Sequence, residues 1–346
     1  MNRLRLHRPT QRGWTLVELM IGITIGMLML IALGSLYFST TQSRSLLASV
    51  SDQIESARYA LDMIGHETEL AGFYGETGQA RSATVSMPSL CATTSTALGF
   101  ANSPVTMPVP IQGFAAGTVA SCLPNLSAQS EILAIRRVST TSAAAATASA
   151  TTGQAYLQNS ACGSDPVPFV FDTSAAAFTL QTKACTSSAL APLRAAVVRI
   201  FYLAACDNCA GSGDGIPTLK MAELINGAFQ VNSIAQGIQD MHFSFGVDQD
   251  NNGSADCYVD NPGIDNSGAC TSVTGYSWAT PSANWHNVTS VRISLLARTT
   301  TRANGWTDTR QYDLGRSSPS GPFNDGYKRH VYAQVARLAN VAGPRE

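Results

Sequence analysis

The sequence predicts an α+β protein, in which one long N-terminal helix is followed by an antiparallel, β-rich head with disulfides. Three features carry this prediction: an apolar N-terminal run, a helical period that continues beyond it, and short β-branched segments accompanied by eight cysteines. The expected helix covers residues 14–72 and the expected head covers residues 73–346. A candidate linker lies at residues 139–155, where Ser, Thr and Ala are abundant.

Residues 14–38 form an apolar run with a single charge, Glu18. This run is long enough to cross a bilayer as a helix, which needs roughly 20 apolar residues. A simple signal anchor explains its length, but it leaves Glu18 unexplained because a charge at mid-bilayer costs about 2.5–3.5 kcal/mol on insertion scales. A secretory signal peptide fits less well, since its apolar core is shorter and it ends at a small-residue cleavage site. The run is preceded by basic residues, which stay in the cytoplasm: Arg3, Arg5, Arg8 and Arg12.

The junction between the basic and apolar parts reads RGWTLVEL over residues 12–19. This run resembles the prepilin signature of type IV pilins and type II secretion pseudopilins. The resemblance implies that a prepilin peptidase removes residues 1–13 as a leader, cutting between Gly13 and Trp14, and that Trp14 is then N-methylated. It also implies that Glu18 neutralises the terminal amine of a neighbouring subunit in a filament. One departure is Trp14, which stands where phenylalanine is usual.

The helix is expected to continue past the apolar run. Apolar and small residues recur at alternating spacings of three and four from Leu47 to Thr68, which predicts one face of an amphipathic helix. No proline lies between Trp14 and Pro88, and Gly72 and Gly75 supply a C-terminal stop. We expect the apolar face of this part to pack on the head of the same chain.

Short strands are expected after Gly75, where the helical period disappears. Because no helices separate them, they predict an antiparallel sheet. The expected strands cover residues 132–138, 169–171, 177–181, 197–204, 241–247, 288–299 and 329–336.

The eight cysteines are expected to lie in the oxidising periplasm, because the basic flank keeps the N-terminus in the cytoplasm. Eight cysteines allow 105 pairings, and one or two unpaired cysteines are the alternative to full pairing. The set that we favour joins neighbours in sequence: Cys91 with Cys122, Cys162 with Cys185, Cys206 with Cys209, and Cys257 with Cys270.

A candidate calcium loop starts at Asp248 and reads DQDNNGSAD over residues 248–256. Oxygen ligands at Asp248, Asp250, Asn252 and Asp256, with a backbone carbonyl at Ser254, match positions of an EF-hand-type loop. The twelfth position holds valine rather than glutamate, so waters or Asp260 would complete the shell. A polar hairpin turn is the alternative, because Asp, Asn and Gly also favour turns.

Cys206 and Cys209 have the spacing of a redox motif, but they precede a glycine-rich loop rather than a helix. A local structural disulfide is the favoured interpretation. No G-x-S-x-G motif occurs and the histidines are scattered, so the sequence predicts no enzyme.

Further runs resemble the PilW-type minor pilins, in order along most of the chain. They lie at residues 56–75, 214–219, 245–248, 291–296 and 336–340. The resemblance implies a minor pilin that primes type IV pilus growth at or near the pilus tip, with no required cofactor. Its implied partners are other minor pilins, the major pilin, a tip adhesin, the inner-membrane assembly platform and the prepilin peptidase. The head would face the periplasm before assembly and lie on the cell surface afterwards.

Two alternatives remain open: a minor pseudopilin of type II secretion, and a membrane-anchored periplasmic redox protein using Cys206 and Cys209. The formal net charge is −1, and loss of the four leader arginines brings it to −1 − 4 = −5. A net-acidic chain argues against a general nucleic-acid partner. The sequence does not distinguish among adhesion, twitching motility and DNA uptake as the function of the pilus.

Overall fold

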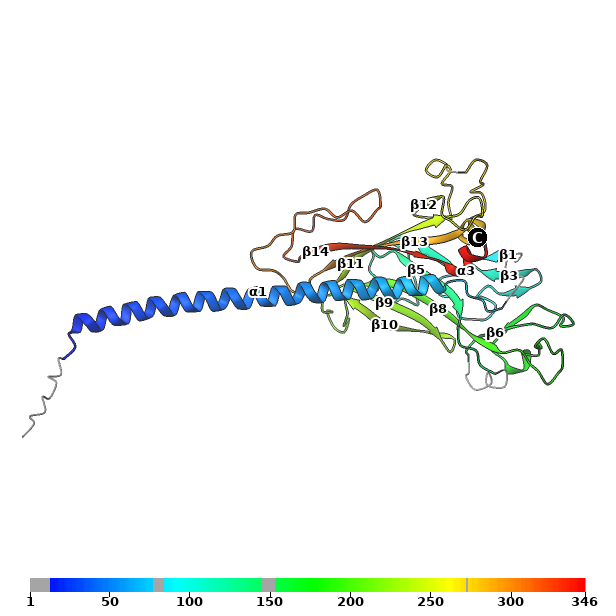
Figure 1. Cartoon of the computed structure of the whole chain (residues 1–346), viewed down its shortest axis with the longest axis horizontal. Helices are drawn as coiled ribbons and strands as arrows, with labels where there is room; N and C mark the ends of the chain where they lie inside the picture. The colour runs from blue at the N-terminus through cyan, green and yellow to red at the C-terminus, as the bar shows by residue number, and fades with distance from the viewer. Residues whose placement is uncertain (1–12, 77–83, 145–152, 272, 346) are drawn as a thin grey trace, which may run out of the picture. The chain divides into compact units, whose positions relative to one another are not determined.

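The computed structural model describes residues 13–76, 84–144, 153–271 and 273–345. It confirms the predicted fold class: one long helix, α1 (Leu16–Leu70), is followed by largely antiparallel sheets and four disulfides (Figure 1). The chain divides into two units, Met1–Ser51 and Asp52–Glu346, so α1 contributes to both.

In the first unit, residues 16–51 form the N-terminal part of α1. Their apolar side chains are exposed, with Leu16 at 74% and Phe38 at 75% of full accessibility. Among the described residues, α1 is the one helix that is long and apolar enough to cross a membrane. Gly22, Gly26 and Gly34 face open space, because a Cβ added at any of them would meet no atom within 4 Å outside the helix's own nearby backbone.

In the second unit, residues 52–70 of α1 pack on the head through a stripe of small and apolar side chains. Ala57, Ala60 and Ile64 are fully buried in the main core. Gly65 allows close approach to β14 (Arg329–Arg337), because a Cβ at this position would lie 2.8 Å from the side chain of Gln334. This confirms that the helix packs on the head of its own chain.

The largest sheet has seven strands and is antiparallel. Its main path runs β10-β9-β8-β5-β4, and β6 pairs with both β8 and β7. Its strands are β4 (Ile111–Phe114), β5 (Ile132–Val138), β6 (Tyr156–Asn159), β7 (Phe169–Asp172), β8 (Leu193–Ala204), β9 (Thr218–Ile225) and β10 (Ala228–Gln236).

A second antiparallel sheet has the order β12-β11-β13-β14. It consists of β11 (Ile238–Val247), β12 (Cys257–Val259), β13 (Val288–Arg298) and β14. Side chains from α1, β8 of the first sheet and β11 and β13 of the second meet in one core, which includes Phe201, Phe243 and Ile293. The helix and both sheets therefore share a single hydrophobic core.

A small third sheet departs from the antiparallel expectation. It joins β1 (Thr84–Ser86), β3 (Val105–Pro108) and β2 (Ala101–Asn102), and its β1–β3 pair is parallel. Short helices complete the described fold: α2 (Pro281–His286), α3 (Ala339–Ala342), η3 (Ala175–Ala177) and η4 (Gly343–Arg345).

Most expected strands are present: the strand at residues 132–138 matches β5 at both ends, and the ends of the others differ by at most four residues. The expected strand at residues 177–181 is wrong: η3 ends at Ala177, and Gln181 forms only an isolated bridge with Leu190. The candidate linker at residues 139–155 lies partly outside the described residues. In its described part, Ala143 pairs with Leu193 of β8.

Candidate functional site

The N-terminal end of α1 carries the three residues of the expected processing and assembly site. Gly13 and Trp14 precede the helix, and Trp14 is 81% exposed. The Glu18 carboxylate accepts hydrogen bonds from the Thr15 backbone N–H (2.9 Å) and the Thr15 hydroxyl (3.0 Å). In return, the Glu18 N–H donates to the Thr15 hydroxyl oxygen at 3.3 Å.

This reciprocal arrangement is a capping box, which satisfies backbone donors at a helix N-terminus. It holds the Glu18 carboxylate beside the peptide of Trp14 and Thr15. The carboxylate also offsets the partial positive charge that the helix dipole places at this end of α1.

Glu67 forms a second charged centre, where α1 meets the large sheet. Its buried carboxylate accepts from Arg137 of β5, with Nε to Oε2 at 3.1 Å and Nη2 to Oε1 at 3.2 Å. Arg199 of β8 also donates to Glu67, and it continues to Glu223 of β9 at 2.8 Å. Two carboxylates and two guanidinium groups therefore link α1 to three neighbouring strands.

Glu67 was not among the site residues predicted from the sequence. The signal that could have revealed it is its position three residues after the buried Ile64, beside the apolar stripe of α1. A glutamate there is buried, and a buried carboxylate needs a cationic partner.

The candidate calcium loop brings three of its expected ligands together. Carboxylate oxygens of Asp248, Asp250 and Asp256 lie within 4.8 Å of one another. The side chain of Asn252 is held in the same loop by two hydrogen bonds. Its Nδ2 donates to Asp250 Oδ2 at 2.9 Å, and its Oδ1 accepts from the Ser254 backbone N–H at 2.8 Å. The converging oxygens are the ligand type that calcium prefers.

Asp248 is also the partner of Arg345, close to the C-terminus. The Arg345 guanidinium donates to Asp248 Oδ2 at 2.9 Å and to the His286 carbonyl oxygen at 3.1 Å. Burial alone would raise the pKa of Asp248, but Arg345 and the N–H groups of the loop outweigh this and lower the pKa. The donor set fits a hard cation, although any ion would share Asp248 with a guanidinium.

Asp260, the alternative to waters for completing the calcium shell, does not lie among the three converging carboxylates. Its Oδ1 lies 3.3 Å from Nε2 of His242, whose Nδ1 lies 2.9 Å from Glu131 Oε1. Ser244 Oγ is 3.2 Å from the same Nε2. Burial lowers the pKa of His242, but Glu131 and Asp260 outweigh this and raise it.

The order of Ser244, His242 and Glu131 follows that of a nucleophile, base and carboxylate. However, Ser244 is only 4% exposed, and Asp260 competes for the same ring nitrogen. The group therefore acts as a buried link between β11 and the chain segments beside it.

The cysteines are joined in the sequence-local pairs that we favoured. Cys206 and Cys209 lie in the loop between β8 and β9, where Asp214 accepts from the backbone N–H groups of Asp207 (3.1 Å) and Asn208 (2.8 Å). This loop continues into a strand instead of opening a helix. The geometry is that of a structural turn and lacks the helix N-terminus on which redox motifs depend.

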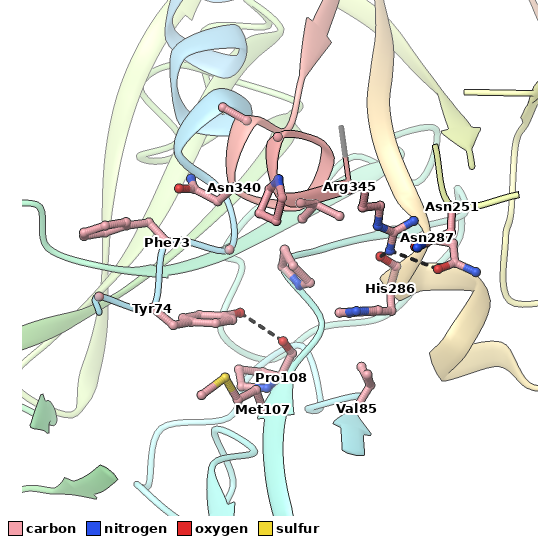
Figure 2. A pocket seen from close by; sticks show the side chains of 17 residues that line it. Phe73, Tyr74, Val85, Met107, Pro108, Asn251, His286, Asn287, Asn340 and Arg345 are labelled. Atoms are coloured by element: carbon pink, nitrogen blue, oxygen red, sulfur yellow. Dashed lines mark hydrogen bonds between the residues drawn. The ribbon is translucent and has the colours of Figure 1, made fainter. Parts of the chain in front are cut away.

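A cavity of about 860 Å³ lies where α1 ends and the C-terminal residues return (Figure 2). Tyr74 donates its hydroxyl to the Pro108 carbonyl oxygen at 2.9 Å on one side, and Arg345 lines the other. Burial and the nearby Arg345 lower the pKa of His286 to about 4, so its imidazole is neutral at pH 7. The cavity wall is thus mixed aromatic and polar, with its guanidinium already paired to Asp248.

Comparison with protein families gives two matches. The prokaryotic N-terminal methylation motif matches residues 8–34, and the type IV pilus-assembly protein W family matches residues 200–340. Searches of curated proteins and of solved structures gave no match. The first match and the apolar helix define the class, a chain with a prepilin-type N-terminus, and together with the second match they fit an inner-membrane-anchored pilin that is assembled into the type IV pilus.

The second match makes the assignment more specific. The chain is a PilW-type pilin with a prepilin signature. The PilW match covers all four strands of the four-stranded sheet together with β9 and β10, so it falls on the head.

Proposed function

We propose that this chain is a minor pilin that primes type IV pilus growth and lies at or near the pilus tip. The observation that carries the proposal is the joining of a prepilin N-terminus to a PilW-type head on one continuous helix. The matched family is described as an assembly protein, which favours a role in building the fibre.

The physical basis of this function is a change of environment for one helix. Residues 14–38 have exposed apolar side chains, which a bilayer covers before assembly and neighbouring helices cover in the filament. Glu18 is costly in both environments unless it meets a cation. The amine of a processed neighbouring subunit would supply that cation.

The head would select the neighbours. Its partners in this proposal are other minor pilins, the major pilin and a tip adhesin, while the peptidase and the inner-membrane platform act on the precursor. The disulfides and the Glu67 cluster give the head a fixed shape and bind it to α1, so that contacts made by the head are transmitted to the helix.

We propose calcium as a weakly bound structural ion of the loop at residues 248–256. The three converging carboxylates support this, and Asp248, Asp250 and Asp256 would hold the ion. Its role would be to neutralise the repulsion among these carboxylates.

A pseudopilin of type II secretion is the second candidate, because it shares the prepilin N-terminus. Location separates the two. An epitope inserted at the exposed Gly211 would be followed by immunogold labelling on pili, in a strain whose own copy is deleted. Gold at pilus ends, together with few pili in the deletion strain, is the expected result. Normal piliation without the chain, or labelling along the whole shaft, would overturn the proposal.

A further inference from the structure

The outermost strand of the large sheet, β10, has an open hydrogen-bonding side. Within the described residues, β10 pairs only with β9 and ends the sheet. Most of its residues alternate between exposed and half-buried along its length.

The register shows which backbone groups point outward. A two-residue turn, Asn226-Gly227 with φ of 52° and 80°, joins β9 to β10 and is of the type that closes tight hairpins. Ile225 and Ala228 flank this turn and exchange both hydrogen bonds, so alternate residues of β10 face β9. Phe229 and Val231 therefore direct their N–H and C=O groups away from the sheet.

Two edge strands of the head, β14 and β10, differ in how well their side chains prevent pairing with a strand of another chain. β14 carries the exposed basic residues His330 and Arg337, and charges on an edge discourage pairing with another chain. β10 has no charged residue and no proline over its nine residues. Natural proteins rarely leave such a strand uncovered, because it is a template for another strand.

We propose that β10 receives an extended, uncharged segment of a neighbouring pilus subunit as an added strand. The occupant is set by the chemistry of the edge, because only an extended backbone presents N–H and C=O groups at matching intervals. Phe229 and Val231 offer half-buried apolar surface on one face, and Gln230 and Asn232 offer exposed amides on the other. The added segment should therefore alternate apolar and polar side chains.

This inference rests on the proposed assembly into a pilus. A second copy of β10 is disfavoured as the occupant, because pairing of one edge with itself requires a two-fold axis. Subunits whose N-terminal helices run in the same direction in a filament are related head to tail, so β10 should meet a different segment of its neighbour.

The test uses the full chain in cells that lack their own copy. A photo-crosslinking amino acid replaces Gln230, whose exposed side chain borders the open edge. In a second variant, Gln230→Lys and Asn232→Lys place charge on the edge without touching the core. The matched control, Ser317→Lys with Ser318→Lys, adds the same charge to exposed positions between β13 and β14.

We expect a cross-link from position 230 to an extended segment of another pilus subunit, and loss of the double-lysine variant from sheared pili. The control should enter pili as the wild type does. Wild-type incorporation of the edge variant, or a cross-link only to a second copy of the chain, would overturn the inference. If the wild-type chain were found only in a secretion pseudopilus, the proposed function would fail. A cross-link from position 230 to an extended segment of a pseudopilin would in that case still support strand addition at β10.

Discussion

One helix contains two stretches that obey opposite rules. In residues 16–51 of α1, large apolar side chains are exposed, as in Leu28 at 67% and Leu33 at 64%. In residues 52–70 the apolar side chains that face the head are buried, and Ala57 and Ile64 are inaccessible. The first stretch is matched to a surrounding that the chain itself does not supply, whereas the second is matched to the chain's own sheets.

The two glutamates of these stretches show the same contrast. Glu18 is exposed and, among the described residues, hydrogen-bonded only to Thr15, and the cationic partner that we propose for it is the amine of a neighbouring subunit. Glu67 is buried and paired with Arg137 and Arg199. The comparison indicates that the first stretch is suited to contacts made during assembly, whereas the second is suited to packing within the folded chain. Mutations in the two stretches should therefore fail in different ways.

The largest effect is expected from Gly13→Val, which should abolish leader removal. The chain itself tolerates the change, because a Cβ at Gly13 meets no atom within 4 Å. The loss would therefore come from the peptidase, which by resemblance requires a small residue before the cut. Gel mobility of the full chain checks this, and the precursor should persist.

The head of this variant should remain folded with all four disulfides, as shown by thiol labelling under denaturing conditions. Processing at the wild-type rate would contradict the assignment of the cleavage site.

Glu67→Ala is expected to destabilise the head by about 3–5 kcal/mol, because it leaves the buried Arg137 guanidinium without its carboxylate. Glu69→Ala is the matched control: Glu69 is exposed two residues away, and its loss should change the free energy of unfolding by about 0.5 kcal/mol or less. Urea unfolding of the detergent-solubilised chain, followed by fluorescence of the buried Trp278 and Trp285, gives both values.

Leader removal in Glu67→Ala should still occur, since the N-terminal stretch is unchanged. Equal stability of the two variants would show that the cluster adds nothing to the docking of α1.

Glu18→Ala should leave cleavage intact and reduce incorporation into pili several-fold, because the neighbouring amine then lacks its carboxylate. Glu18→Gln keeps the capping hydrogen bonds to Thr15 but removes the charge, so it separates capping from neutralisation. The measurement is the ratio of this chain to major pilin in sheared pili. If the glutamine variant assembles normally, capping rather than charge is the contribution of Glu18.

Much of the difference between the two stretches of α1 could be predicted from the sequence, because it follows from hydrophobic periodicity and from local motifs. The prepilin junction, the continuous helix and the strands at 132–138 and 288–299 follow from hydrophobic pattern and from Gly and Pro positions. The sequence-local disulfides agree with the structure, which joins each cysteine to its neighbour in sequence at separations of 3, 13, 23 and 31 residues.

Features that depend on contacts between distant segments were missed. Glu67 meets Arg137 and Arg199 only after β5 and β8 have paired, and no local pattern relates these positions. Arg345 likewise reaches Asp248 from the opposite end of the head sequence. The β9–β10 hairpin was also missed, although Asn226-Gly227 is a strong turn signal, because the alternation that begins at Phe229 is interrupted by the register shift between Ser233 and Ala235.

The smallest expected effect concerns calcium. With a dissociation constant of about 1 mM, calcium at about 10 mM would stabilise the folded head by about 1.4 kcal/mol, which is a few degrees in melting temperature. Asp250→Ala should remove this shift, because Asp250 is one of the three converging carboxylates. Asp313→Ala is the control, an exposed aspartate that accepts a loop N–H elsewhere in the head.

Arg345 sharpens this test. Its guanidinium already neutralises Asp248, so it competes with calcium for the same carboxylate. Arg345→Ala should therefore lower the stability of the calcium-free chain and increase the calcium-dependent shift, whereas a purely structural turn would show the first change without the second. An equal shift with calcium and with magnesium, in wild type and Asp250→Ala alike, would reduce the loop to a turn. In that case the head would carry no ion-dependent element, and Arg345 alone would balance the charge of Asp248.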